Sequence, residues 1–147
     1  MMNNTNILES LNRLLQRQME AEKEYLEGLN RVIHAGLKRF LFTQAQSKNT
    51  FIHQISSEIQ HLGGEIASSE MQNPRYIDWD AILKKDVPTI YRQCIMAEEN
   101  MLQEYENLIR NSWWGETTLN LLRIQHSEIL KSLEQKMEME ESLKQPF

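Results

Sequence analysis

The stretch VPTIYRQCIMAEENMLQEYENLIRN, residues 87–111, decides the fold class. One set of its residues recurs every three or four positions, which is the helical period, and consists of Val87, Tyr91, Cys94, Glu98, Met101, Tyr105 and Leu108. All of these side chains except Glu98 are apolar or aromatic, and a carboxylate is costly to bury. The stretch therefore predicts an amphipathic helix with one charged group in its apolar face.

Three further stretches repeat apolar residues at the same period. Residues 6–33 carry the stripe Leu11, Leu15, Gln18, Glu22, Tyr25, Leu29 and Val32. Residues 37–62 carry Leu37, Leu41, Ala45, Lys48, Ile52, Ile55, Ile59 and Leu62. Residues 117–143 carry Leu119, Leu122, His126, Ile129, Leu133 and Met137. Together with residues 86–111, they predict four long helices that pack nearly parallel, at about 20°.

Turn signals separate the four predicted helices. His34-Ala35-Gly36 is a plausible stop for the first helix, and the short link that follows makes the first two helices antiparallel neighbours. Gly63-Gly64 ends the second helix, and Asp86 is a suitable N-cap for the third, with Pro88 in its first turn.

Residues 63–85 form a crossover long enough to run from one end of the bundle to the other, with a short helix that docks Trp79. Two helical hairpins joined by one long crossover form the ferritin-like arrangement. We therefore predict an all-α, antiparallel four-helix bundle that occupies residues 1–147 as a single domain.

Composition excludes several classes of protein. The chain of 147 residues has a net charge of −5 and no cluster of Lys and Arg, which argues against nucleic-acid binding. Its single cysteine, Cys94, cannot form an internal disulfide and weakly favours a reducing compartment. The N-terminus lacks a signal-peptide pattern, and no apolar run approaches the ~20 residues that cross a bilayer. We therefore expect a cytoplasmic protein that has no membrane partner.

Polar residues fall near the middle of each predicted helix, where the helices of antiparallel hairpins face one another. They are Glu22, Lys48, Glu98, and the pair Arg123 and His126. The hypothesis that follows is a buried polar cluster in which Glu22 pairs with Lys48 and Glu98 pairs with Arg123. Such pairs fix the register of helices more than they stabilise the fold, because desolvation offsets most of the attraction.

The same positions match only half of the ligand pattern of a dinuclear carboxylate site. That pattern uses one Glu from each of two helices and Glu-x-x-His from each of the other two. Glu22 and Glu98 match its first half. The second helix reads Lys48-Asn49-Thr50-Phe51 and the fourth reads Arg123-Ile124-Gln125-His126 instead. We therefore expect no metal or other cofactor, with cationic side chains in place of a di-metal site.

The alternative is a degenerate site that holds one iron, manganese or zinc ion. Its ligands are Glu22, Glu98 and His126, with Gln125 or His53 as a further ligand. Such a protein has a redox or metal-storage role.

The chain resembles an uncharacterised bacterial ferritin-like family whose domain is known only as one of unknown function. The residues that carry the likeness span about 6–140 and include Leu11-Asn12, Glu22-Lys23, Tyr25, Phe40, Lys48, Phe51, Leu62-Gly63-Gly64, Trp79, Cys94, Glu98, Tyr105 and His126. The resemblance implies a closed bundle with one crossover and no established activity. The chain is more distantly similar to rubrerythrins and ferritins, which bind two irons. Lys48, Phe51 and Arg123 depart from the ligand pattern of those proteins.

The preferred interpretation is a non-catalytic ferritin-like bundle without catalytic residues, acting as an interaction or stress-related protein. The side chains of Phe42, Trp113, Trp114 and Phe147 are candidates for an exposed apolar patch that supports a homodimer.

Overall fold

The described part of the chain folds into four long helices and one short one. The computed structural model describes residues 4–67, 75–111 and 113–144. Its helices are α1 (Asn4–Arg31), α2 (Ala35–His61), α3 (Trp79–Ile82), α4 (Val87–Ile109) and α5 (Glu116–Lys144). Each long helix begins and ends within two residues of its predicted bounds. The prediction of an all-α fold is confirmed, since the described residues contain no strand.

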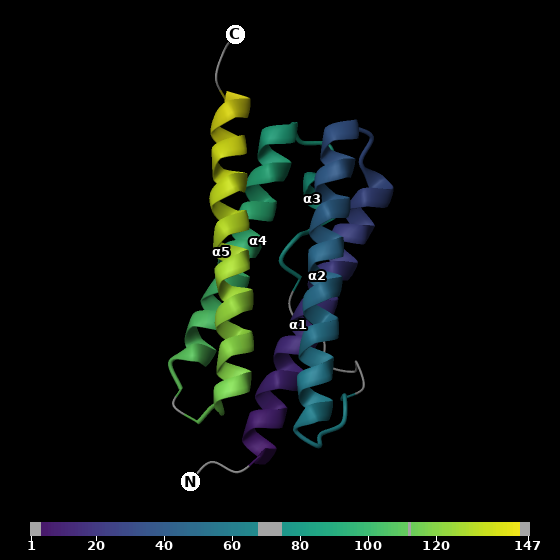
Figure 1. Ribbon diagram of the computed structural model, residues 1–147. Coiled ribbons are helices and arrows are strands. Elements are labelled where there is room, and N and C mark those ends of the chain that lie inside the picture. Colours follow the sequence, from purple (N-terminus) through teal and green to yellow (C-terminus); the bar gives the residue numbers. More distant parts are fainter. Residues whose placement is uncertain (1–3, 68–74, 112, 145–147) are drawn as a thin grey trace.

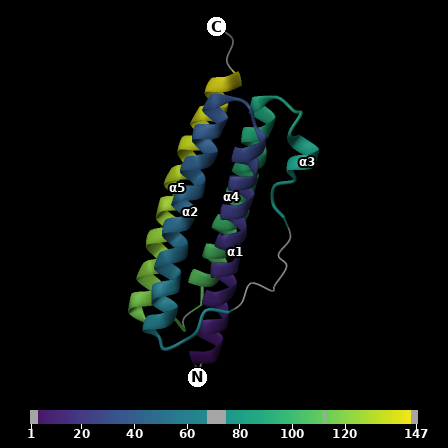
Figure 2. The same ribbon diagram turned by 90° about the vertical axis from the view of Figure 1, so that its right-hand side faces the viewer.

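The long helices form two antiparallel hairpins, α1 with α2 and α4 with α5 (Figure 1). The view in Figure 2 shows α2 on the side of α5 and α1 on the side of α4. The helices α2 and α4 begin at the same end of the bundle, the upper end in Figure 1, so the crossover between them runs the length of the bundle. This is the predicted topology.

Side chains define where the helices begin and end. The first helix ends at Arg31, and the Nδ1 atom of His34 accepts a hydrogen bond from the Leu37 amide at 3.0 Å. His34 therefore caps the start of α2, and Gly36 lies inside α2, so the predicted glycine stop of the first helix is wrong. Gly63, with φ of +81°, ends α2 as predicted, while the Gly64 amide donates to the Ile59 carbonyl.

The crossover is held against α1. Trp79 is fully buried, and its indole N–H donates to the backbone carbonyl of Glu24 at 2.7 Å. The carboxylate of Glu24 accepts the backbone amides of Tyr76 at 2.7 Å and Ile77 at 3.3 Å. The Trp79 ring lies so close to Gly28 that an added Cβ atom would be 2.1 Å from it. One turn of α1 thus anchors the end of the crossover.

Two apolar clusters make up the core, one toward each end of the bundle. The lower cluster includes Leu11, Leu15, Ile55, Met101, Tyr105 and Leu122. The upper cluster includes Tyr25, Leu41, Ala45, Trp79, Cys94 and Ala97. Between the two lie buried charged side chains, so the polar centre interrupts the apolar core. None of the described helices has a stretch apolar enough to cross a bilayer.

Candidate functional site: a buried charged centre

Glu98 on α4 lies at the centre of a buried network to which each long helix contributes one side chain. Its Oε2 atom lies 2.9 Å from the Nζ atom of Lys48 on α2. Its Oε1 atom lies 3.5 Å from the Nζ atom of Lys136 on α5 and accepts a hydrogen bond of 2.8 Å from the hydroxyl of Tyr25 on α1. We call these four residues the Glu98 network; it ties all four long helices together at one level.

Burial and charge set the protonation states in the Glu98 network. Burial raises the pKa of Glu98, but the charges of Lys48 and Lys136, together with the hydrogen bonds from Lys48 and Tyr25, lower it to about 2 from the ordinary value of 4.5. Burial lowers the pKa of Lys136, and the nearby Glu98 carboxylate opposes this effect. Burial also raises the pKa of the Tyr25 hydroxyl well above its ordinary value. At neutral pH the network therefore has an anionic Glu98 and a Tyr25 hydroxyl that remains a donor.

A second polar layer lies closer to the lower end of the bundle. The Tyr105 hydroxyl accepts a hydrogen bond from Gln18 Nε2 at 2.8 Å and donates one to Gln125 Oε1 at 2.5 Å. Gln125 Nε2 in turn donates to Gln54 Oε1 at 2.9 Å. These residues again come from all four long helices. The layer carries no formal charge. It therefore specifies the packing of the helices without the free-energy cost of desolvating an ion.

The structure brings together two of the five residues predicted for the buried polar cluster. Lys48 and Glu98 pair with each other, so the predicted pairs Glu22–Lys48 and Glu98–Arg123 are wrong. The side chain of Arg123 is exposed. Glu22 is half-buried at the edge of the bundle, where it accepts a hydrogen bond of 2.9 Å from Asn49.

His126 also lies outside the Glu98 network. It is half-buried, whereas its neighbour Gln125 is fully buried. The inward stripe of α5 continues from Gln125 through Ile129 and Leu133 to Lys136. The predicted stripe used His126 and Met137, each one residue further along the helix, which rotates both positions by about 100°. The same error placed Glu22 inward on α1, where the structure buries Ala21.

The sequence pattern carried a signal for the network residues that were not predicted. Lys136 follows Leu133 by three residues and Ile129 by seven, which is the spacing of the stripe. A lysine is normally placed on the solvent face, so the apolar Met137 was preferred at this point. Tyr25 was predicted to lie in the core. Its contact with Glu98 was not predicted, because the two residues are far apart in the sequence.

The Glu98 network does not fit a metal ion. It contains one carboxylate, and each oxygen of that carboxylate faces an ammonium group, which has no lone pair with which to bind a metal. Glu22 and His126, the other ligands of the alternative single-metal site, lie outside the network. Within residues 4–67, 75–111 and 113–144, no three His, Cys, Asp or Glu side chains are grouped so that they could hold a metal ion.

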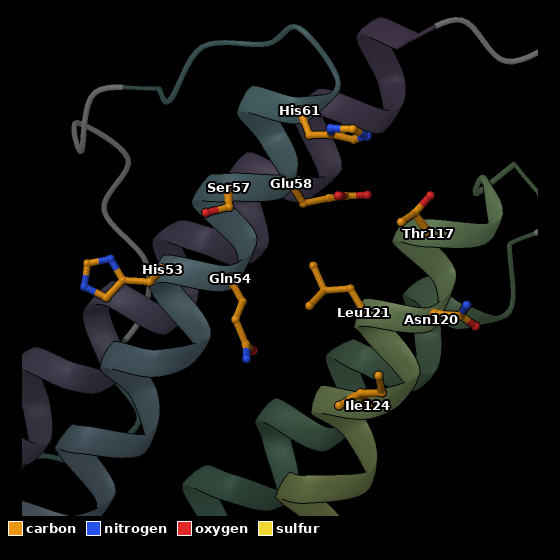
Figure 3. Close-up of a pocket in the computed structure, with 9 residues that line it drawn as sticks. All are labelled: His53, Gln54, Ser57, Glu58, His61, Thr117, Asn120, Leu121 and Ile124. Carbon is orange, nitrogen blue, oxygen red and sulfur yellow. The ribbon is translucent and has the colours of Figure 1, made fainter.

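A groove of about 700 Å³ opens between α2 and α5 near the C-terminal end of α2 (Figure 3). Figure 3 shows Gln54, Glu58 and Leu121 pointing into the space between the helices and His53 pointing away from it. Glu58 and His61 have the Glu-x-x-His spacing, although this pair was not among the predicted site residues. Glu58 is bound instead by the Thr118 hydroxyl, at 2.5 Å.

The predicted apolar patch is not assembled as expected. Trp114 is buried and donates its indole N–H to the Leu108 carbonyl at 2.7 Å, while its ring stacks on Trp113. The side chain of Phe42 is 50% exposed, and Phe147 lies outside the described residues. Trp114 therefore cannot contribute to a dimer contact in this conformation, and the homodimer stays a prediction.

The fold and the buried centre define a ferritin-like four-helix bundle, and comparison with known proteins agrees. The chain belongs to the family described as a domain of unknown function, DUF2383, whose sequence profile matches residues 6–111. It is similar to a solved structure described as ferritin-like, diiron-carboxylate proteins from Bacillus anthracis str. Ames. The TM-score is 0.69 at 16% sequence identity, over 97% of this chain and 99% of that one, which supports the fold alone. No curated protein matches the sequence.

Proposed function

We propose that this chain is a non-catalytic ferritin-like bundle in which buried lysines replace the cations of a dinuclear metal centre. The observation that carries the proposal is the position of Glu98 between Lys48 and Lys136, at 2.9 Å and 3.5 Å. In a metal centre, bound ions keep buried carboxylates charged. Here the two ammonium groups perform this task, and the protein acts through its surface as an interaction protein.

Electrostatics opposes a metal ion at Glu98. Two unit charges 4 Å apart repel by about 4 kcal/mol at the effective dielectric constant of about 20 that suits protein sites. A divalent ion bound to Glu98 would meet roughly twice this repulsion from each of the two lysines. Binding would therefore require that both lysines lose their protons or leave the centre. Either change costs free energy, because it breaks contacts in a buried polar network.

The alternative function is metal binding with a redox or storage role. Two observations favour it: the similar solved structure is described as a diiron-carboxylate protein, and α2 carries the Glu58-x-x-His61 spacing. In this alternative, the ion binds at Glu98 after the lysines move, or near Glu58 in the α2–α5 groove.

Elemental analysis of protein purified without a chelating tag, from cells supplied with iron, manganese and zinc, separates the two functions. We expect far less than one metal ion per chain. A double variant, Lys48→Glu with Lys136→Glu, converts both cations to carboxylates and should bind a divalent metal at the centre. Lys131→Glu, which changes an exposed lysine on α5, is the matched control and should bind none.

Stoichiometric metal in the wild-type protein would overturn the proposal. Its loss in Glu98→Gln would place the ion at the centre, and its loss in Glu58→Gln would place it in the groove. Circular dichroism of each variant shows whether the helical bundle is retained.

A further inference from the structure

We propose that a depression at the upper end of the bundle binds a small organic acid, meaning one carboxylate or phosphate group carried on an apolar body. The depression is formed by the first turns of α2, the start of α4 and the end of α5, and it encloses about 430 Å³. This volume is within the range of small-molecule sites. The inference does not depend on the proposed function, because none of the lining residues belongs to the Glu98 network.

The charged group that lines the depression is the guanidinium of Arg39, and no Asp or Glu lines it. His34 also lines it, with its Nδ1 atom accepting the Leu37 amide. Within the described part of the chain, Arg39 forms no ion pair. An adjoining depression shares His34 with the first and adds Lys84 and Lys85, again without a lining acid. In a chain with 21 acidic and 16 basic residues, such a surface favours an anionic ligand.

Other lining residues of the depression are apolar or aromatic. The rings of Phe40 and Tyr91 lie 4.5 Å apart between centroids, at an interplanar angle of 47°, and both line the depression. The flexible thioether of Met139 on α5 lies beside them and is about half exposed. Aromatic faces and methionine together suit an apolar or aromatic body of variable shape.

The side chain of Gln44 supplies a hydrogen-bond donor for the same ligand. Gln44 is only 8% exposed, it lines the depression, and its side chain has no hydrogen-bond partner among the described residues. The fully buried polar atoms that lack a partner do not include those of Gln44, so water or a ligand can reach its amide. An oxygen atom of a bound acid would accept a hydrogen bond from the Gln44 amide.

Two acidic residues lie next to lining residues in the sequence, and each contacts a group other than Arg39. Glu140, next to Met139, lies 3.7 Å from the guanidinium of Arg92. Asp86, next to Val87, accepts the Thr89 amide as the N-cap of α4. Neither acid lines the depression, and they contact Arg92 and Thr89, respectively.

Isothermal titration calorimetry with phenyl phosphate tests the proposal, with inorganic phosphate and phenol as the two halves of the probe. We expect phenyl phosphate to bind roughly tenfold more tightly than either half, a difference of about 1.4 kcal/mol. Arg39→Met should weaken binding by about tenfold, because it removes a charge-assisted hydrogen bond. Lys131→Met, on the exposed face of α5, is the matched control and should leave the affinity unchanged.

Gln44→Leu gives a second measurement with two readouts. It should weaken the binding of phenyl phosphate severalfold, because it removes a hydrogen-bond donor, and should leave the melting temperature of the free protein unchanged. A purely structural Gln44 would instead lower the melting temperature and leave binding unchanged.

Three outcomes would overturn the proposal: phenyl phosphate binding no tighter than inorganic phosphate, an unchanged affinity in Arg39→Met, or sedimentation with phosphatidylglycerol vesicles without binding of phenyl phosphate. The last outcome would assign the basic lining to a lipid surface.

Discussion

The Nζ atom of Lys48 lies 2.9 Å from the Oε2 atom of Glu98, and the two side chains are among the most buried in the protein. Lys48 belongs to the first hairpin and Glu98 to the second. The contact forms only when the two hairpins pack in the correct register. A shift of one helical turn, about 5 Å, would leave both charges unpaired in the core.

Removal of Lys48 should strongly destabilise the protein. We expect Lys48→Met to lower the free energy of unfolding by about 3 kcal/mol, near the lower end of the range for breaking a buried pair, because Lys136 and Tyr25 still contact Glu98. Urea denaturation followed by circular dichroism measures the change. Lys131→Met serves as the surface control and should change stability by less than about 0.5 kcal/mol. Equal effects of the two variants would contradict the importance of the buried pair.

Acid should weaken the bundle through Glu98. The pKa of Glu98 is lowered to about 2 in the folded state, so its contribution to stability is complete above the ordinary pKa of 4.5 and is lost as pH falls through 2. The shift corresponds to about 3 kcal/mol. In Glu98→Gln, the unfolding free energy should therefore depend less on pH between 5 and 2 than in the wild-type protein. Parallel pH profiles of the two proteins would contradict the lowered pKa of Glu98 in the folded state.

The ionisation of Glu24 should change the stability of the protein in the opposite direction to the ionisation of Glu98. Burial raises its pKa to about 7 from 4.5, against the lowering effect of its hydrogen bond from the Ile77 amide. The folded state therefore holds this proton more tightly, and stability falls as pH rises from 4.5 through 7. After allowance for nearby solvent, the expected loss is about 1–2 kcal/mol. Glu24→Gln should flatten the profile of unfolding free energy between pH 5 and pH 8, and a profile as steep as that of the wild-type protein would refute this assignment.

The approach of Trp79 to Gly28 predicts a coupled pair of substitutions. A Cβ atom at Gly28 would lie 2.1 Å from the Trp79 ring, so Gly28→Ala should lower the unfolding free energy by about 1–3 kcal/mol through overpacking. Trp79→Phe removes the clashing part of the ring, and the double variant should lose less stability than the sum of the single variants. Gly115→Ala, where the added atom meets nothing within 4 Å, is the matched control. Additive losses would mean that the crossover does not pack on α1 in this way.

Tyr105→Phe tests the uncharged polar layer. The substitution keeps the ring but leaves Gln18 Nε2 and Gln125 Oε1 without the hydroxyl that joins them. Two buried polar atoms without a partner should cost about 1–3 kcal/mol in unfolding free energy. Thermal unfolding monitored by circular dichroism measures this loss. An unchanged melting temperature would indicate that water replaces the hydroxyl in the layer.

The periodic pattern of the sequence was sufficient to predict the helices, because apolar stripes and turn residues are local signals. The sequence predicted correctly which sides of the helices that carry Lys48 and Glu98 face the core. In the central stripes of these helices, only one residue at each step fits the helical period. The rotation failed on α5, where two neighbouring residues both fit a step of three or four. There the choice between Gln125 and His126, or between Lys136 and Met137, depends on partners from other helices, which a single sequence does not reveal.

For the same reason the pairing of charges was only half correct. The sequence indicated that a buried carboxylate needs a cation, and Lys48 supplies one. It could not indicate that a second cation comes from near the end of α5, because that contact depends on how α4 and α5 are aligned and rotated within the second hairpin.

The arrangement of Lys48, Glu98 and Lys136 also bears on how the protein matures. The positive charges that face the carboxylate are synthesised with the polypeptide, at a fixed stoichiometry. The counter-ions that face Glu98 are therefore available as soon as the chain folds, and their supply does not depend on a carrier that delivers them.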